Sequence, residues 1–223
     1  MPQPPRLAVL GSSEEPLARG AASPGAAGAD VVIAICADET AFEPLADGPV
    51  PAIAWCAAGA RPRLGPRDRW VSALSAPGAW RHLPLPVADD HFRERDGGVR
   101  WLGEPSERRA EYLARYPAPD GGAPVAVNLR DAEPARLEHR AAAALAAGLV
   151  LVSEPLERRR GLEPGLDYVE AEELDDLFAA VEAATRRPQA FERMRLRGRA
   201  KAESFRASTL TERAAADLLL ELR

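Results

Sequence analysis

The hydrophobic positions of this chain fall into short apolar runs separated by polar or alanine-rich segments. The runs at 6–11, 30–36 and 52–56 are apolar almost throughout, which is typical of strands in a parallel sheet that is covered on both faces. Weak helical segments are expected between them, at 14–29 and 39–46. This alternation of strand and helix predicts a doubly wound α/β unit in the first half of the chain.

The same pattern begins again after the polar stretch 89–98, which we interpret as a linker. Ser106 is placed to cap a helix, and Gly148 is placed to end one. The capping-box pair of Thr209 and Glu212 predicts the start of the last helix. The further expected strands are 99–103, 123–129, 149–153 and 167–170, and the region 57–98 holds two short apolar pieces near 71–74 and 82–87 without an assigned structure. The further helices are 106–116, 135–147 and two amphipathic ones around 174–181 and 191–205. The sequence therefore predicts two domains, residues 1–95 and 96–223.

Composition narrows the class of protein. The chain has 223 residues with 29 basic and 34 acidic side chains, a net charge of −5, which argues against a nucleic-acid-binding surface. No apolar run reaches 18 residues, so no membrane span is expected. The start of the chain lacks the apolar core of a signal peptide, and Cys36 and Cys56 lie in strand-like runs as reduced thiols would. We expect a cytoplasmic protein, and the abundance of Ala, Pro and Arg indicates a bacterial, GC-rich source.

Candidate chemistry is expected at the carboxyl ends of the strands, where open parallel sheets bind ligands. Two of these loops lead into helices, whose N-termini suit phosphate groups. The glycine patterns of dinucleotide-binding and phosphate-binding loops are absent. His91 lies beside Asp89 and Asp90, but three polar residues on a linker do not predict a metal site. The four loops are 11–13, 103–106, 128–133 and 153–161.

The charged triplet Glu138-His139-Arg140 begins an otherwise alanine-rich helix. His139 suits proton transfer near neutral pH, and Arg140 suits a phosphate or carboxylate. The alternative is a solvated face with a histidine that is exposed or bonded in the core. The run 158–160, three arginines, is similarly either a solvated loop or a basic lip over a diphosphate.

Residues 99–220, and most clearly Val125 to Glu170, resemble bacterial glycosyltransferase family 1-like proteins, in particular those related to spore-maturation glycosyltransferase-like domains. The segments that carry the resemblance are VAVNLRDAEPARLEHRA, LAAGLVLVSEPL and GLEPGLDYVEA. The resemblance implies two small Rossmann-like domains in a GT-B-like arrangement. It also implies a metal-independent hexosyltransferase without a cofactor, which moves a sugar from a nucleotide diphosphate sugar to an unknown acceptor.

The resemblance also implies roles for individual residues. In a site of this kind, Glu138 and His139 would face the reacting sugar, and Asp38, at the end of a strand in the first half, is a candidate base beside Glu39. The residues expected to bind the nucleotide sugar are Asn128, Arg140, Ser153, Glu154, Gly161, Leu162 and Glu163.

Two departures keep other functions open. Many family members carry a glutamate that contacts the nucleotide ribose where this chain has Ala143, and both halves of the chain are short. The alternatives are a non-catalytic GT-B-like binding or scaffold protein, and an α/β protein of unrelated activity.

Overall fold

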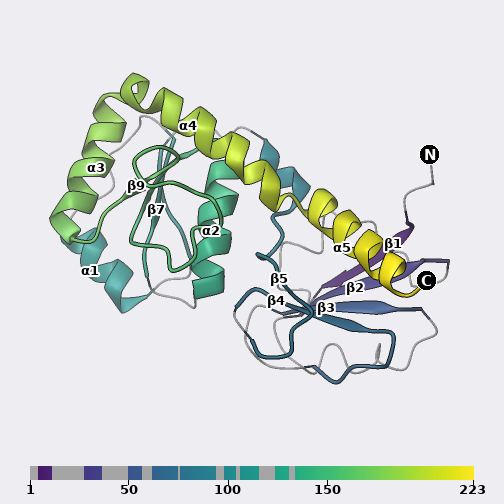
Figure 1. Cartoon of the computed structure of the whole chain (residues 1–223). Coiled ribbons are helices and arrows are strands. Elements are labelled where there is room, and N and C mark those ends of the chain that lie inside the picture. The colour runs from purple at the N-terminus through teal and green to yellow at the C-terminus, as the bar shows by residue number, and fades with distance from the viewer. Residues whose placement is uncertain are drawn as a thin grey trace. The chain divides into compact units, whose positions relative to one another are not determined.

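The computed structural model divides the chain into two compact units, residues 1–90 together with 204–223, and residues 91–203. Each unit is built on a parallel sheet (Figure 1). The predicted domains were residues 1–95 and 96–223, with the last helix in the second domain. The two units of the structure differ from them, because they meet at residues 90 and 91 and the last helix belongs to the first unit. The structure describes residues 5–11, 28–36, 50–56, 62–74, 76–93, 98–103, 106–115, 124–130 and 134–223.

The first unit contains a five-stranded parallel sheet in which consecutive strands are neighbours. Its core consists of uninterrupted apolar strands, so Ile33 and Ile53 are paired in register and are fully buried. The last strand ends at His82, because Pro84 and Pro86 in the apolar piece 82–87 lack the N–H groups that a ladder requires. The strands are β1 (Leu7–Gly11), β2 (Val31–Cys36), β3 (Ala52–Cys56), β4 (Arg69–Ser72) and β5 (Arg81–His82). The predicted helices 14–29 and 39–46 fall largely outside the described residues.

The last helix, α5 (Ala207–Glu221), belongs to the first unit. Glu221 accepts hydrogen bonds from Arg69 and from the indole of Trp80, which fixes the end of the helix to the sheet. The predicted capping box is wrong, because the helix begins two residues before Thr209. The Asp89 carboxylate instead accepts a hydrogen bond from the Ser208 amide at 3.1 Å. The short helix η3 (Asp89–Phe92) therefore provides the group that satisfies this helix end.

The second unit contains a four-stranded parallel sheet in the order β6-β7-β8-β9. Helices α1 and α3 cover the face that carries Val125, Val127, Val150 and Val152, and α2 covers the opposite face (Figure 1). The strands are β6 (Val99–Trp101), β7 (Val125–Asn128), β8 (Val150–Ser153) and β9 (Val169–Glu170), and the first three helices are α1 (Glu107–Arg115), α2 (Pro134–Ala146) and α3 (Leu174–Arg186).

The helix ends of this unit follow the sequence signals. The Ser106 hydroxyl accepts a hydrogen bond from the Arg109 amide at 3.1 Å, which confirms the predicted cap of α1. Gly148 has a φ of 70° and ends α2 as predicted. Helix α4 (Pro188–Ala202) packs against α2 and leads through η4 (Glu203–Phe205) into α5.

The predicted α/β class is therefore confirmed, with two parallel sheets compatible with Rossmann-like domains. Among the helices that the structure describes, none combines the length and the apolar character needed to cross a membrane.

Candidate functional site

The residues predicted to form one site lie in three separate environments of the second unit. These environments are a pocket beside α2, a buried cluster under the loop after β8, and a polar pocket at the carboxyl ends of the strands. Asp38 and Glu39, together with the loop 11–13 beyond Gly11, lie outside the described residues. The structure therefore separates groups that the sequence prediction had assigned to one site.

The first environment, here called the α2 pocket, is a cavity of about 200 Å³ between α2 and β6. Four side chains that carry or can carry positive charge line it, and the described residues of its lining include no carboxylate. In a chain with a net charge of −5, such a concentration of basic groups favours an anion. The residues that line it are His91, Arg100, Leu102, Gly103, His139, Arg140, Ala143, Ala144, Ala147 and Leu149.

Arg140 and the loop after β6 meet in this pocket. Gly103 has a φ of 93°, and a Cβ atom there would overlap the guanidinium group of Arg140. Because glycine has no side chain, position 103 leaves the space at the carboxyl end of β6 that the Arg140 guanidinium occupies. The sequence predicted the loop 103–106 and Arg140 as phosphate-binding elements separately, and the structure places Gly103, the first residue of that loop, beside Arg140.

The floor of the α2 pocket is apolar. Ala143 lies one helical turn after His139, and Ala147 follows four residues later, just past the end of α2. Leu102 and Leu149 complete the apolar lining. The pocket thus combines a basic side with a smooth floor against which a flat ring can pack. Ala143, where the resemblance predicts a ribose-binding glutamate, contributes only a methyl group.

Glu138 does not line the α2 pocket. Its side chain is buried, and Oε2 accepts from Arg160 Nε at 3.4 Å, while no donor within the described residues reaches Oε1. Burial raises the pKa of the Glu138 carboxyl, and the nearby Arg160 and Arg158 only partly oppose this effect. Glu138 lies on the same buried face of α2 as Ala141, Ala142 and Leu145, whereas His139 and Arg140 line the pocket.

Asn128 and Ser153 end two neighbouring strands and are completely buried. The Asn128 amide donates to the Leu137 carbonyl at 3.1 Å and to the Ser153 hydroxyl at 3.2 Å. The Ser153 hydroxyl in turn donates to the Glu154 carbonyl at 2.7 Å. The Asn128 amide nitrogen and the Ser153 hydroxyl therefore tie β7, β8 and α2 together, whereas no donor among the described residues reaches the buried Asn128 Oδ1.

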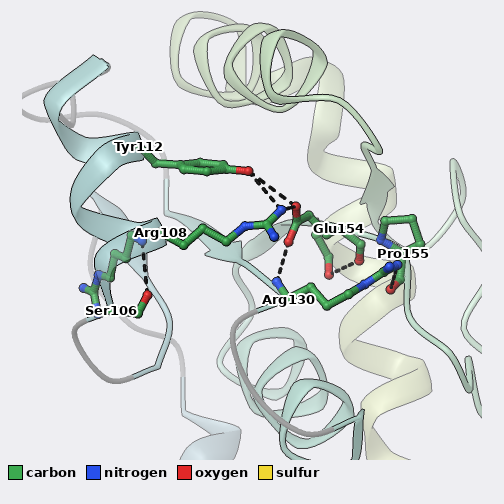
Figure 2. A network of polar contacts seen from close by, with 8 residues as sticks. Ser106, Arg108, Tyr112, Arg130, Glu154 and Pro155 are labelled. Atoms are coloured by element: carbon green, nitrogen blue, oxygen red, sulfur yellow. Dashed lines mark hydrogen bonds and ion pairs between the residues drawn. The ribbon is translucent and has the colours of Figure 1, made fainter.

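Glu154 is the centre of a polar network at the carboxyl ends of the strands (Figure 2). Its carboxylate, which is almost completely buried, accepts from the Arg108 guanidinium, from the Arg130 backbone amide and, at 3.5 Å, from the Tyr112 hydroxyl. Its own amide donates to the Asn128 carbonyl. Glu154 thus links the elements after β6, β7 and β8 at a single carboxylate.

A second cavity, here called the polar pocket, lies against this network and has a volume of about 430 Å³. Charges of both signs line it, in contrast to the α2 pocket. Its lining comes from α1, from the loops after β7 and β8, and from the segment between β9 and α3. The residues that line it are Arg108, Arg130, Glu154, Pro155, Glu172 and Glu173.

The predicted residues Gly161, Leu162 and Glu163 form the part of the loop that is fixed to α4. Lys201 donates from Nζ to the Gly161 carbonyl at 2.8 Å and lies 3.3 Å from the Glu163 carboxylate. Leu162 is buried. Arg160, next to Gly161, has a φ of 48°, an unusual backbone conformation for a residue other than glycine. The loop is thus held by α4 on one side and by Glu138 of α2 on the other.

Sequence reasoning missed several residues of these pockets. Arg100 could have been found, because Val99 and Trp101 are apolar and strand alternation places Arg100 on the opposite face. Tyr112 lies one helical turn after Arg108, which is a weak signal of a common face. His91 lies in the short helix η3 and Arg130 lies in the segment after β7, and no local pattern assigns either of them to a pocket.

No protein-family model matches this chain, and no curated protein matches it.

Proposed function

We propose that this protein is a metal-independent glycosyltransferase of GT-B type that binds a nucleotide diphosphate sugar with its second unit. The observation that carries the proposal is the α2 pocket, in which Arg140 lies over Gly103 at the carboxyl end of β6. The carboxyl ends of parallel strands are where open α/β sheets bind nucleotides. The sequence resemblance of Val125 to Glu170 supports the same class of reaction.

The lining of the α2 pocket suits a diphosphate joined to a flat base. Arg100 and Arg140 are permanently charged, and a guanidinium group can donate two parallel hydrogen bonds to a phosphate. His91 and His139 can add positive charge or donate hydrogen bonds. The alanine floor of α2 leaves room for a base or sugar ring to pack against it.

The same side chains suit the chemistry of sugar transfer. Negative charge accumulates on the leaving diphosphate as the bond to the sugar breaks, and fixed cations stabilise that charge. In the proposal, Arg140 and Arg100 take this role, and His139 gives a proton to the leaving phosphate oxygen. The acceptor and its base belong to the first unit in this proposal, with Asp38 as the predicted base.

Nucleotide binding tests the proposal directly. We expect one of UDP, GDP, dTDP, ADP or CDP to raise the melting temperature, because ligand at 100 times its Kd adds about 2.7 kcal/mol of stability. Arg140→Ala should abolish this shift. Arg136→Ala is the matched control, because Arg136 is an exposed arginine on the same helix that does not line the pocket. Equal shifts in both variants would contradict the proposed site.

A second function, nucleotide binding without catalysis, is favoured by a specific observation. The described lining of the α2 pocket carries no carboxylate, because Ala143 is a methyl group and Glu138 is paired with Arg160. The two functions are separated by incubating the protein with the stabilising nucleotide sugar. Release of nucleoside diphosphate over time indicates turnover, whereas saturable binding without any release favours the non-catalytic protein.

A further inference from the structure

The polar pocket is distinct in chemistry from the α2 pocket. It lies where β7, β8 and β9 end, the edge of a parallel sheet at which ligands bind, and its volume of about 430 Å³ is sufficient for a sugar ring. Among the described residues, two arginines and three glutamates line it, and Pro155 is the one apolar side chain of this set. Such a lining offers hydrogen-bonding groups and little apolar surface.

Part of this lining is fixed by internal bonds. The Glu154 carboxylate is occupied by Arg108 and by the Arg130 amide, and Arg130 Nη2 donates to the Pro155 carbonyl at 3.1 Å (Figure 2). The Tyr112 hydroxyl oxygen accepts a further hydrogen bond from Arg108 Nη2 at 3.1 Å. These contacts hold the two guanidinium groups at one side of the pocket, so they do not need to be ordered by a ligand.

The other side of the pocket consists of unused acceptors. Glu172 and Glu173 are exposed carboxylates, and among the described residues no hydrogen bond or ion pair engages either side chain. They lie one residue beyond the end of β9, and Glu173 is the residue that precedes α3. The pocket thus presents donors from Arg108 and Arg130 on one side and free acceptors from Glu172 and Glu173 on another.

We infer that the polar pocket binds a carbohydrate, with Glu172 and Glu173 accepting hydrogen bonds from its hydroxyl groups and Arg130 donating to its oxygens. An anion is disfavoured because the glutamates outnumber the arginines, and a simple cation would meet Arg108 and Arg130. A hydroxyl group both donates and accepts, so a neutral polyol satisfies both sides. The inference deepens the proposed function, on which it rests for the identity of the ligand as a substrate sugar.

The test uses sugars without phosphate, so that the α2 pocket is not involved. Glucose, galactose, mannose and N-acetylglucosamine are each titrated at millimolar concentration into the full-length ¹⁵N-labelled chain, and amide shifts are recorded. Glu172→Gln/Glu173→Gln removes both free carboxylates and keeps their shape. Asp175→Asn/Asp176→Asn is the matched control, because it removes the same charge from the exposed start of α3 without touching the pocket.

We expect at least one sugar to shift the amides of Arg130, Glu154, Glu172 and Glu173. Its affinity should fall about tenfold in the Glu172/Glu173 variant and remain unchanged in the Asp175/Asp176 variant. The inference is overturned if no sugar shifts these amides, if both variants weaken binding equally, or if serine, a zwitterion, shifts them while the sugars do not. Because nucleoside diphosphate binding is tested separately through Arg140, failure of one proposal leaves the other distinguishable.

Discussion

The guanidinium group of Arg140 occupies the space that a side chain at Gly103 would fill. Arg140 belongs to α2, and Gly103 belongs to the loop after β6, so this contact joins the helix on one face of the sheet to the end of its edge strand. The contact depends on glycine for two reasons. A φ of 93° is unfavourable for other residues, and the space beside the Cα atom is taken.

Gly103→Ala should therefore displace Arg140 from the α2 pocket. We expect nucleoside diphosphate affinity to fall at least about tenfold, which corresponds to the loss of a charged hydrogen bond. Isothermal titration calorimetry measures this effect. Gly98→Ala is the control, since Gly98 also has a positive φ, 111°, but nothing lies within 4 Å of its Cβ position. Both variants should lose about 1–2 kcal/mol of stability, but only the first should lose affinity.

Strand positions were predictable because buried parallel strands are uninterrupted apolar runs, as in Val31–Cys36 and Val150–Ser153. The place of α5 was not predictable. Leu210, Ala214 and Leu218 form an ordinary apolar face that fits either sheet, and the bonds that fix the helix join Glu221 to Arg69, 152 residues away. Long-range pairs of this kind leave no periodic signal in the sequence.

For the candidate site, the sequence predicted which segments contribute, but not where their side chains point. The pattern indicated that Glu138, His139 and Arg140 are important, but consecutive helical residues point about 100° apart. Glu138 is therefore buried against Arg160 of the loop after β8, while its two neighbours line the α2 pocket. Glu154 was correctly placed at the end of a strand, but its partner Arg108 lies 46 residues away on another helix. The local sequence pattern therefore predicted neither the direction of the Glu138 side chain nor the pairing of Glu154 with Arg108.

Glu138 should give the protein an unusual dependence of stability on pH. Burial raises its pKa in the folded state, so the folded protein takes up a proton at higher pH than the unfolded chain does. This contribution is fully present below the ordinary glutamate pKa and is lost as the pH rises through the raised value. In this pH range the free energy of unfolding changes by at most about 1.4 kcal/mol per pH unit because of this group. Glu138→Gln should remove it, as measured by urea unfolding between pH 4 and pH 8.

Glu192→Gln is the matched control, because the pKa of this carboxyl is shifted in the opposite direction. The hydrogen bond from Arg195 lowers the pKa of the exposed Glu192 carboxyl, so its contribution is present above the ordinary pKa and is lost as the pH falls. Its removal should change the profile only at the acidic end. Identical pH profiles for the wild type and the Glu138 variant would show that the carboxyl group at position 138 titrates normally.

Asp89→Ala should weaken the start of α5. The Asp89 carboxylate accepts a hydrogen bond from the Ser208 amide, and the loss of a capping bond costs about 1 kcal/mol. Hydrogen exchange at the amides of residues 208–211 should accelerate, while exchange in the second unit should not change. Asp90→Ala is the control, because Asp90 is exposed and does not contact this helix end. Equal effects of the two substitutions would assign the change to charge alone.

Gly198→Ala should destabilise the second unit, although alanine normally stabilises a helix interior by about 1 kcal/mol relative to glycine. A Cβ atom at position 198 would lie 2.6 Å from the Asp167 carbonyl oxygen and 2.6 Å from Leu145 Cδ2. The Asp167 backbone cannot easily yield, because its buried carboxylate accepts hydrogen bonds from Arg197 and from the Glu163 amide.

We expect a net loss of about 2 kcal/mol, since overpacking costs typically about 1–3 kcal/mol. Urea unfolding followed by circular dichroism measures this loss. Ala200→Gly, at an exposed position of the same helix, measures the difference in helix propensity between alanine and glycine without the packing effect. It should cost about 1 kcal/mol. If Gly198→Ala instead raised stability by the amount that Ala200→Gly loses, α4 would have room to move away from the loop at Asp167. The close packing that holds residues 161–167 against α4 would then not depend on this glycine.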